Sequence, residues 1–227
     1  MTAVLFARTL DEFCATCLRE GLAINISSHV VRKVGSGRYS VKWTPLRSRE
    51  FRRVPDLDLQ EYLECLRCGD FSLLLADGGL LQVAANFERN EIVESRYYYI
   101  PCPIEFDLAE LNAGGELYPL EDFIDELTTD ELKARLRIRA PFRFELDPAQ
   151  EDLMHPKNHV HVGPSTSRIP VALSVCWNAF SRFIFKNFYP EDFPRVERML
   201  QHPVPYRNNT LSDEDAYELH MSFRVSE

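Results

Sequence analysis

The sequence predicts an α+β protein in which an antiparallel sheet carries helices mainly on one face. Three short apolar segments in the middle of the chain are joined by tight turns, which is typical of antiparallel strands and not of strand–helix–strand units. Later, one segment rich in aromatic residues has the length and pattern of a central helix. The chain has 227 residues, enough to bury a core. We therefore expect a single domain over 1–227, with a helical and basic part over 1–70 and a sheet and core-helix part over 71–227.

The first part reads as helix, strand, helix. Residues 9–20 carry apolar side chains at the spacing of a helix, with Thr9 as the expected N-cap and Gly21 after the last turn. Apolar and polar residues alternate over 39–43, which predicts a strand. A second amphipathic segment predicts a helix over 57–68.

The second part begins with the clearest strand pattern in the sequence. Apolar runs at 71–76, 80–87 and 92–100 are separated by Asp-Gly-Gly and by Glu-Arg-Asn-Glu, and residues of these types favour turns. We expect the three runs to form an antiparallel meander. The acidic stretch that follows, 107–136, fits one or two helices at the surface.

The last third returns to strands, which are expected at 138–146 and 158–163. The aromatic segment, 171–188, contains one tryptophan and four phenylalanines and more aromatic than charged residues. A helix with this composition is expected to pack across the sheet as the core helix. A short helix is expected at 191–201 and a closing strand at 217–225.

Charge is distributed unevenly along the chain, whose formal net charge is −9. The segment 32–53, here called the basic segment, has eight basic residues and one acid, whereas 105–131 has ten acids and no base. An acidic chain repels phosphate, but a basic segment with interleaved aromatic residues is typical of proteins that bind RNA or other single-stranded nucleic acid. The alternative is that the basic segment pairs with the acidic stretch in the fold. On the first interpretation, the nucleic-acid-binding residues are Arg38, Lys42, Trp43, Arg47, Arg49, Arg52 and Arg53.

Six cysteines raise the question of a metal. Two pairs, Cys14 with Cys17 and Cys65 with Cys68, have the CxxC spacing of zinc ligands. Both pairs fall within the expected helices, where cysteines commonly act as small buried apolar residues. The sequence therefore favours reduced, buried thiols over structural zinc, and no cofactor is expected.

A group of polar residues near two expected strands has the composition of a catalytic site. On a strand, His159 and His161 point to the same face, and Arg143 and Glu145 share a face of the preceding strand. We expect His159 to act as general base and His161 as general acid, with Glu145 orienting a ring. Arg143 and Arg168 are expected to stabilise the charge that develops on a phosphodiester. The alternatives are that the rings pack as structural residues, or that they bind a metal ion together with an acid.

Several short motifs, taken in order, resemble a known family. They are SLLLADGGLLQ at 72–82, RYYYIPCP at 96–103, FRFELD at 142–147, HPKNHVH at 155–161, RIPV at 168–171 and KNFY at 186–189. Through them the sequence is similar, over roughly residues 10 to 190, to a bacterial family known as a domain of unknown function, number twenty-two ninety. The resemblance implies a bacterial, cytoplasmic protein associated with mobile-element or phage-defence loci, and it implies no particular reaction.

Two functions agree with these observations. The first is a metal-independent, ribonuclease-like or toxin-like phosphodiesterase, and the motif Arg-x-Glu followed by His-Pro-x-x-His-x-His also resembles small ribonuclease toxins. The second is a non-catalytic accessory or antitoxin-like subunit that holds a protein partner from the same operon. No apolar run has the roughly 20 residues that cross a bilayer, and the N-terminal segment does not resemble a signal peptide. We therefore expect a cytoplasmic protein that does not bind membranes.

Overall fold

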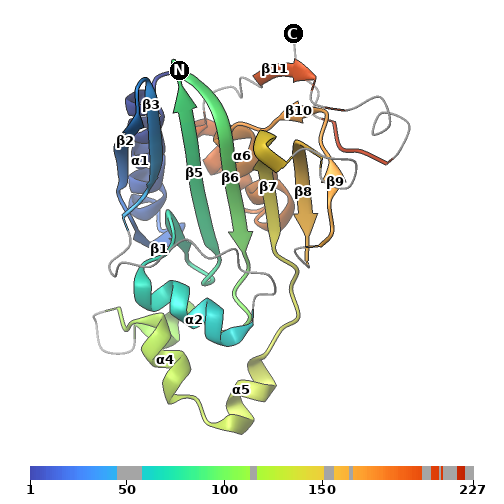
Figure 1. Cartoon of the computed structure of the whole chain (residues 1–227). Helices are drawn as coiled ribbons and strands as arrows, with labels where there is room; N and C mark the ends of the chain where they lie inside the picture. Colours follow the sequence, from blue (N-terminus) through green and yellow to red (C-terminus); the bar gives the residue numbers. More distant parts are fainter. Residues whose placement is uncertain are drawn as a thin grey trace.

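One large antiparallel sheet organises the chain in the computed structural model (Figure 1). Its strands run in the order β1-β4-β5-β6-β7-β8-β9, while β3 pairs with the second half of β5 and carries β2 at its outer side. The strands are β1 (Ala23–Ile26), β2 (His29–Gly35), β3 (Arg38–Trp43), β4 (Leu73–Leu75), β5 (Leu80–Glu88), β6 (Glu91–Ile100), β7 (Phe142–Leu146), β8 (Asn158–Val162) and β9 (Ile169–Pro170). The structure describes residues 1–44, 58–112, 117–150, 156–163, 166–200, 206–209, 211 and 219–222.

Seven α-helices and a small second sheet complete the described part of the chain. The small sheet pairs β10 (Leu173–Ser174) with β11 (Tyr206–Asn209). None of the described helices has the length and apolar character that crossing a bilayer requires. The helices are α1 (Ala3–Arg19), α2 (Leu59–Cys68), α3 (Leu108–Leu111), α4 (Leu120–Glu126), α5 (Thr129–Arg135), α6 (Trp177–Phe188) and α7 (Phe193–Met199), with a 3-10 turn, η1, at Pro148–Gln150.

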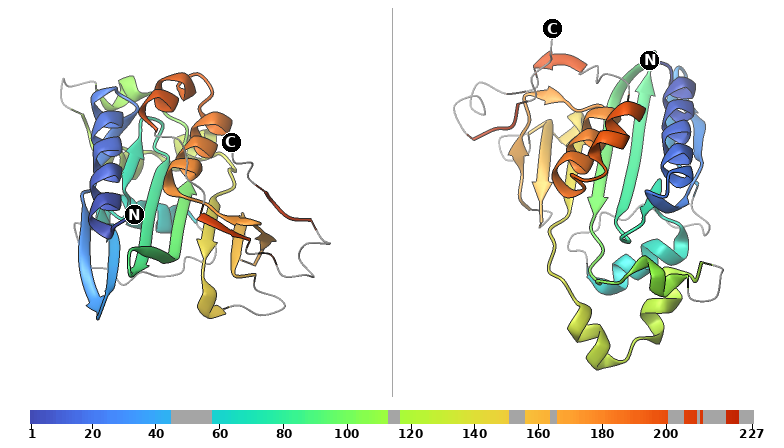
Figure 2. Two further views of the ribbon diagram at one scale, coloured as in Figure 1. Left: turned by 90° about the horizontal axis from the view of Figure 1, so that it is seen from above. Right: turned by 180° about the vertical axis from the view of Figure 1, so that it is seen from behind.

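The two faces of the large sheet have different environments. Helices α1, α6 and α7 lie over one face (Figure 2), and α2 packs against one end of the other face. Because side chains alternate along a strand, the longer strands send apolar residues toward α1, α6 and α7, and away from α2 they send mostly polar residues to the opposite side. On β6, for example, Tyr97 and Tyr99 are buried on the helix side, whereas Arg96 and Tyr98 lie on the opposite side, here called the polar face.

The main core lies between the helix-covered face and the helices α1 and α6. The aromatic ring of Phe180 on α6 lies 5.7 Å from that of Tyr97 and 6.0 Å from that of Phe144, measured between centroids. On α1, Phe6 packs edge-on against Phe87 of β5. Helices from both ends of the chain therefore bury the same sheet.

A second core lies at one end of the sheet, where α2, α3 and α4 pack against the ends of β4, β5 and β6. The turn between β4 and β5 enters this core. Gly78 has a φ of +83°, and a Cβ atom there would lie 2.8 Å from the Cys102 sulfur, so both the backbone and the space require glycine. The hydroxyl of Tyr62 donates a hydrogen bond of 2.6 Å to the carbonyl oxygen of Gly78.

The same turn is also tied to the end of α6. The hydroxyl of Tyr189 donates to the carboxylate of Asp77, with oxygen–oxygen distances of 3.0 and 3.1 Å. It also lies 3.0 Å from the hydroxyl of Tyr99 on β6. Burial, assisted by the Asp77 charge, raises the pKa of Tyr189 far above its ordinary value, so that the hydroxyl keeps its proton.

The predicted fold class is confirmed, and so are the three meander strands, which are β4, β5 and β6. The first helix begins earlier than predicted, because Thr2 caps it by accepting a hydrogen bond from the amide of Leu5. Thr9, the predicted N-cap, lies inside α1 and donates to carbonyl groups of its own helix. Strands β1 and β2 were not predicted. The core helix starts at Trp177, because Cys176 caps it. The expected closing strand at 217–225 lies mostly outside the described residues.

Replacing Tyr62 by phenylalanine is expected to lower the free energy of unfolding by about 1 kcal/mol, because the buried carbonyl of Gly78 loses its donor. Urea denaturation of both proteins measures the difference. The matched control is Tyr118→Phe, since Tyr118 is exposed and donates only to Glu126 at the surface. Equal losses in the two variants would contradict the role of the buried hydrogen bond.

Candidate functional site

Four of the predicted catalytic residues meet on the polar face. The pairing of β7 with β8 places Glu145 directly opposite His159, and Arg143 directly opposite His161. The residues between them, such as Phe144 and Val160, point to the helix side and are buried in the main core. Alternation along two paired strands is thus sufficient to gather all four polar side chains on one face.

The carboxylate and the two imidazoles form a tight group, here called the Glu–His–His cluster. The Nε2 atoms of His159 and His161 lie 2.9 Å apart. One carboxylate oxygen, Oε2 of Glu145, lies 3.2 Å from Nε2 of His161 and 3.3 Å from Nε2 of His159. Three potential donor atoms therefore form a triangle with edges of about 3 Å.

A backbone contact fixes the proton of one ring. Nδ1 of His159 lies 2.7 Å from the carbonyl oxygen of Pro156, and a carbonyl oxygen can only accept a hydrogen bond. The ring must therefore carry its proton on Nδ1 when it is neutral, and Nε2 presents a lone pair to the centre of the cluster. Nδ1 of His161 is buried and has no hydrogen-bond partner among the described residues.

Two arginines hold the other oxygen of the carboxylate. Nε of Arg96 lies 3.3 Å and Nε of Arg143 lies 3.5 Å from Oε1 of Glu145. Arg96 also pairs with Glu94 at 3.3 Å and with Asp147 at 3.7 Å. Sequence reasoning did not assign Arg96 to the site. The available signal was a single basic residue inside an otherwise aromatic strand, at a position that alternates away from the apolar side.

Charge and burial set the protonation of the cluster. Burial alone raises the pKa of Glu145, but the adjacent rings of His159 and His161 and the two nearby guanidinium groups bring this pKa well below its ordinary value. Burial, together with the charge of Arg143, lowers the pKa of His161, while Glu145 opposes this shift. The cluster therefore holds an ionised carboxylate beside a neutral His161 ring at pH 7.

The cluster is buried beneath the protein surface. The exposed fractions of Glu145, His159 and His161 are 7%, 0% and 3%. The side chains of Arg96 and Arg143 retain 20% and 12% of their exposure. These guanidinium groups are thus the more accessible members of the site, and the rings lie deeper.

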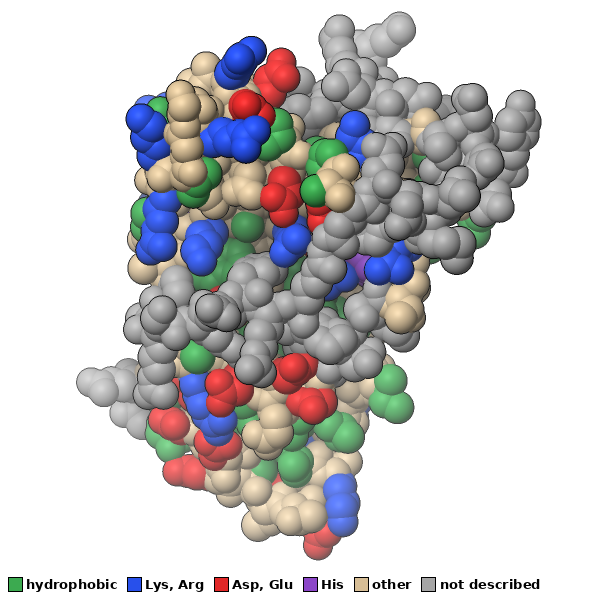
Figure 3. Space-filling model, viewed as in Figure 1, with side chains coloured by type: hydrophobic (Ala, Val, Ile, Leu, Met, Phe, Trp, Pro, Cys, Tyr) green, Lys and Arg blue, Asp and Glu red, His purple; other side chains and the backbone are tan. Residues whose placement is uncertain are grey.

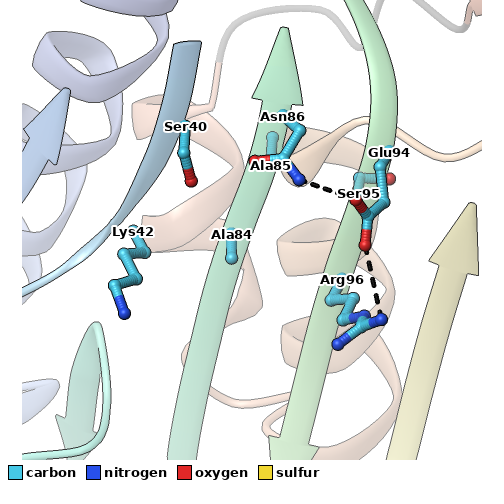
Figure 4. A pocket seen from close by; sticks show the side chains of 8 residues that line it. All are labelled: Ser40, Lys42, Ala84, Ala85, Asn86, Glu94, Ser95 and Arg96. Carbon is cyan, nitrogen blue, oxygen red and sulfur yellow. Dashed lines mark hydrogen bonds and ion pairs between the residues drawn. The ribbon is translucent and has the colours of Figure 1, made fainter. Parts of the chain in front are cut away.

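A shallow pocket of about 200 Å³ adjoins the cluster on the polar face (Figure 4). Lys42 of β3 and Arg96 of β6 lie at its two sides, with Ala84 and Asn86 of β5 between them. The Asn86 amide donates to Glu94 at 2.6 Å, and Glu94 in turn pairs with Arg96. Arg96 belongs to both the pocket and the ion pairs of Glu145, so it connects the two. Figure 3 shows Lys and Arg side chains gathered over this half of the face.

The structure separates several other predicted residues from this site. Arg168 is exposed, and its side chain makes no hydrogen bond or ion pair with the described residues. Trp43 is buried and donates from Nε1 to Asp70 at 2.8 Å, so its indole is not a stacking surface for bases. Arg38 is exposed and pairs with Glu88 at 3.3 Å. The predicted binding residues Arg47, Arg49, Arg52 and Arg53 lie outside the described residues.

The paired cysteines lie in the two cores. Cys14 and Cys17 on α1 are buried against the sheet, and Cys65 on α2 is buried in the second core. Burial raises the pKa of Cys17 to about 12 and that of Cys14 well above its ordinary value. These thiols are protonated and act as apolar core residues in this structure.

Comparison with known proteins addresses the family and not the reaction. No curated protein and no solved structure matches the chain. One family model matches residues 33–223, a range that contains the polar face, the pocket and the Glu–His–His cluster. Its description is "Uncharacterized conserved protein (DUF2290)". Because the match spans most of the chain, the resemblance noted in the motifs is confirmed, and the protein belongs to the DUF2290 family.

Proposed function

We propose that the protein binds single-stranded nucleic acid on the polar face of its sheet and cleaves a phosphodiester bond at the Glu–His–His cluster. One observation carries the proposal: Arg96 lines the surface pocket and also contacts the carboxylate of the cluster. A phosphate held in the pocket by Lys42 and Arg96 would be bound by the same guanidinium group that contacts Glu145 of the cluster. Cation and proton-transfer groups are therefore adjacent, as cleavage of a phosphodiester requires.

Each group of residues has a distinct part in this proposal. The guanidinium groups of Arg96 and Arg143 are partly exposed and neutralise phosphate charge. Glu145 holds both guanidinium groups through Oε1 and both rings through Oε2, so it positions the cations relative to the imidazoles. Nε2 of His159, which presents a lone pair, would accept the proton of the attacking oxygen, and His161 would donate a proton to the leaving oxygen. Arg168, which makes no contact with the cluster, has no part in this arrangement.

The proposal predicts that the double variant His159→Ala/His161→Ala loses cleavage of labelled single-stranded RNA while its affinity for the RNA changes little. The rings are buried below the binding surface, so their removal affects the reaction more than the binding. Gel analysis of products measures cleavage, and fluorescence anisotropy measures affinity. Lys186→Ala on the exposed side of α6 is the control and should cleave like the parent protein. Equal products from the parent and the double variant would contradict the proposal.

Binding is tested separately through Lys42. The variant Lys42→Glu is expected to weaken RNA affinity and to reduce the dependence of log Kd on log salt by roughly 0.7, the value for one lost contact to a single strand. The matched control is Lys133→Glu on α5, which lies in the acidic end of the molecule and is highly exposed. If both charge reversals change the salt dependence equally, nucleic acid does not bind at the pocket.

A further inference from the structure

The three donor atoms of the Glu–His–His cluster have the arrangement of a metal site. We infer that Nε2 of His159, Nε2 of His161 and Oε2 of Glu145 bind one divalent transition-metal ion. The edges of the triangle are 2.9, 3.2 and 3.3 Å. A point about 2.0–2.2 Å from all three atoms then exists, and the ligand–metal–ligand angles there are roughly 90–110°, as tetrahedral or octahedral sites need.

Contacts outside the triangle orient two of the three ligands, His159 and Glu145, toward its centre. The Pro156 carbonyl accepts the Nδ1 proton of His159 and thereby directs the Nε2 lone pair inward. A metal-bound histidine usually has such a partner at its second nitrogen, often a backbone carbonyl. In the same way, Arg96 and Arg143 occupy Oε1 of Glu145 and leave Oε2 to the rings. The ligand atoms of His159 and Glu145 are therefore oriented before any ion enters.

Hydrogen bonds pair the three inward-facing ligand atoms of the cluster less completely than a bound cation would. With His159 carrying its proton on Nδ1, the Nε2 proton of a neutral His161 is shared between two acceptors, Nε2 of His159 and Oε2 of Glu145. A cation interacts favourably with all three lone pairs at once. The surrounding carboxylates, Glu94 and Asp147, balance the two arginines, so an added cation meets an environment that is not net positive.

The ligand set indicates the class of metal. Two imidazole nitrogens and one carboxylate oxygen suit zinc, iron, cobalt or manganese, whereas magnesium and calcium prefer oxygen ligands only. Three protein ligands leave at least one position for water or a substrate oxygen, as in catalytic sites. The inference stands apart from the proposed nuclease activity, because an ion can bind here whether or not RNA is cleaved.

Metal uptake is measured directly on the full chain. The protein is dialysed against a chelator, supplied with Co²⁺ or Zn²⁺, passed through a desalting column and analysed for bound metal. The parent protein is expected to retain one equivalent, and its Co²⁺ form to show visible absorption of nitrogen and oxygen ligation. His161→Ala and Glu145→Gln are each expected to weaken binding by roughly 100-fold. Circular dichroism confirms that each variant is folded.

Two controls separate this site from others in the chain. The variant Cys65→Ala/Cys68→Ala should keep one equivalent, and the near-ultraviolet absorption of cobalt–thiolate bonds should be absent. No stoichiometric uptake by the parent protein, a thiolate band, or uptake unchanged in folded His161→Ala and Glu145→Gln would each overturn the inference. Metal binding without RNA cleavage would overturn only the proposed function, and cleavage by metal-free protein would overturn only a catalytic use of the ion.

Discussion

Replacing Phe180 by alanine is expected to lower the free energy of unfolding by roughly 3–5 kcal/mol. The ring is fully buried in the first turn of α6, where it contacts Tyr97 of β6 and Phe144 of β7. Its removal loses both the buried apolar surface and two aromatic contacts, and leaves a cavity between helix and sheet. Urea denaturation followed by circular dichroism measures the change.

The control lies on the same helix. Phe188 is exposed by more than a third, although it contacts Tyr99 and Phe142. Phe188→Ala is therefore expected to cost clearly less than Phe180→Ala, since part of its surface is already in water. If the two variants are equally unstable, the main core is not centred where α6 crosses β6 and β7.

Replacing Glu145 by alanine is expected to cost a comparable amount, roughly 3–5 kcal/mol, for an electrostatic reason. Its carboxylate is buried and contacts two guanidinium groups and two imidazoles. The alanine variant leaves Arg96 and Arg143 with reduced solvation and without their shared partner. The measurement is made with a chelator present, so that loss of a bound ion does not contribute.

A surface ion pair provides the comparison for Glu145. Glu88 pairs with Arg38 where β5 lies beside β3, and the side chains of Arg38 and Glu88 are 62% and 38% exposed. Glu88→Ala is expected to change the free energy of unfolding by no more than about 1 kcal/mol. A loss for Glu145→Ala no greater than that for Glu88→Ala would show that the arginines of the site do not depend on the carboxylate.

The strands at the centre of the sheet were predictable, whereas those at its edge were not. Strands β4 to β6 have long apolar runs and local turns, so their pattern is visible in a short window of sequence. Among the described strands, β2 pairs with β3 alone, and Arg32 and Lys33 are exposed on it. Apolar and polar residues therefore alternate only weakly along β2, and its basic residues were the one feature that the sequence pattern revealed.

The site was predictable as far as it depends on alternation along a strand. Two residues apart on one strand, His159 and His161 had to share a face. Arg96 reaches the cluster through the pairing of β6 with β7, two strands separated by about 40 residues of chain, and local patterns do not reveal such pairing. Trp43 was wrongly predicted to bind nucleic acid. The alternation that predicted strand β3 already places this side chain on the helix side of the sheet.

The contact of Tyr189 with Asp77 joins residues 112 positions apart in the chain. Helix α1 from the beginning of the sequence and α6 from near its end cover neighbouring parts of the same face of the sheet. During synthesis, the part that packs against α6 stays uncovered until the ribosome has passed α6. Such topology predicts slow folding, completed only after most of the chain has been made, and a nascent protein that relies on chaperones to avoid aggregation.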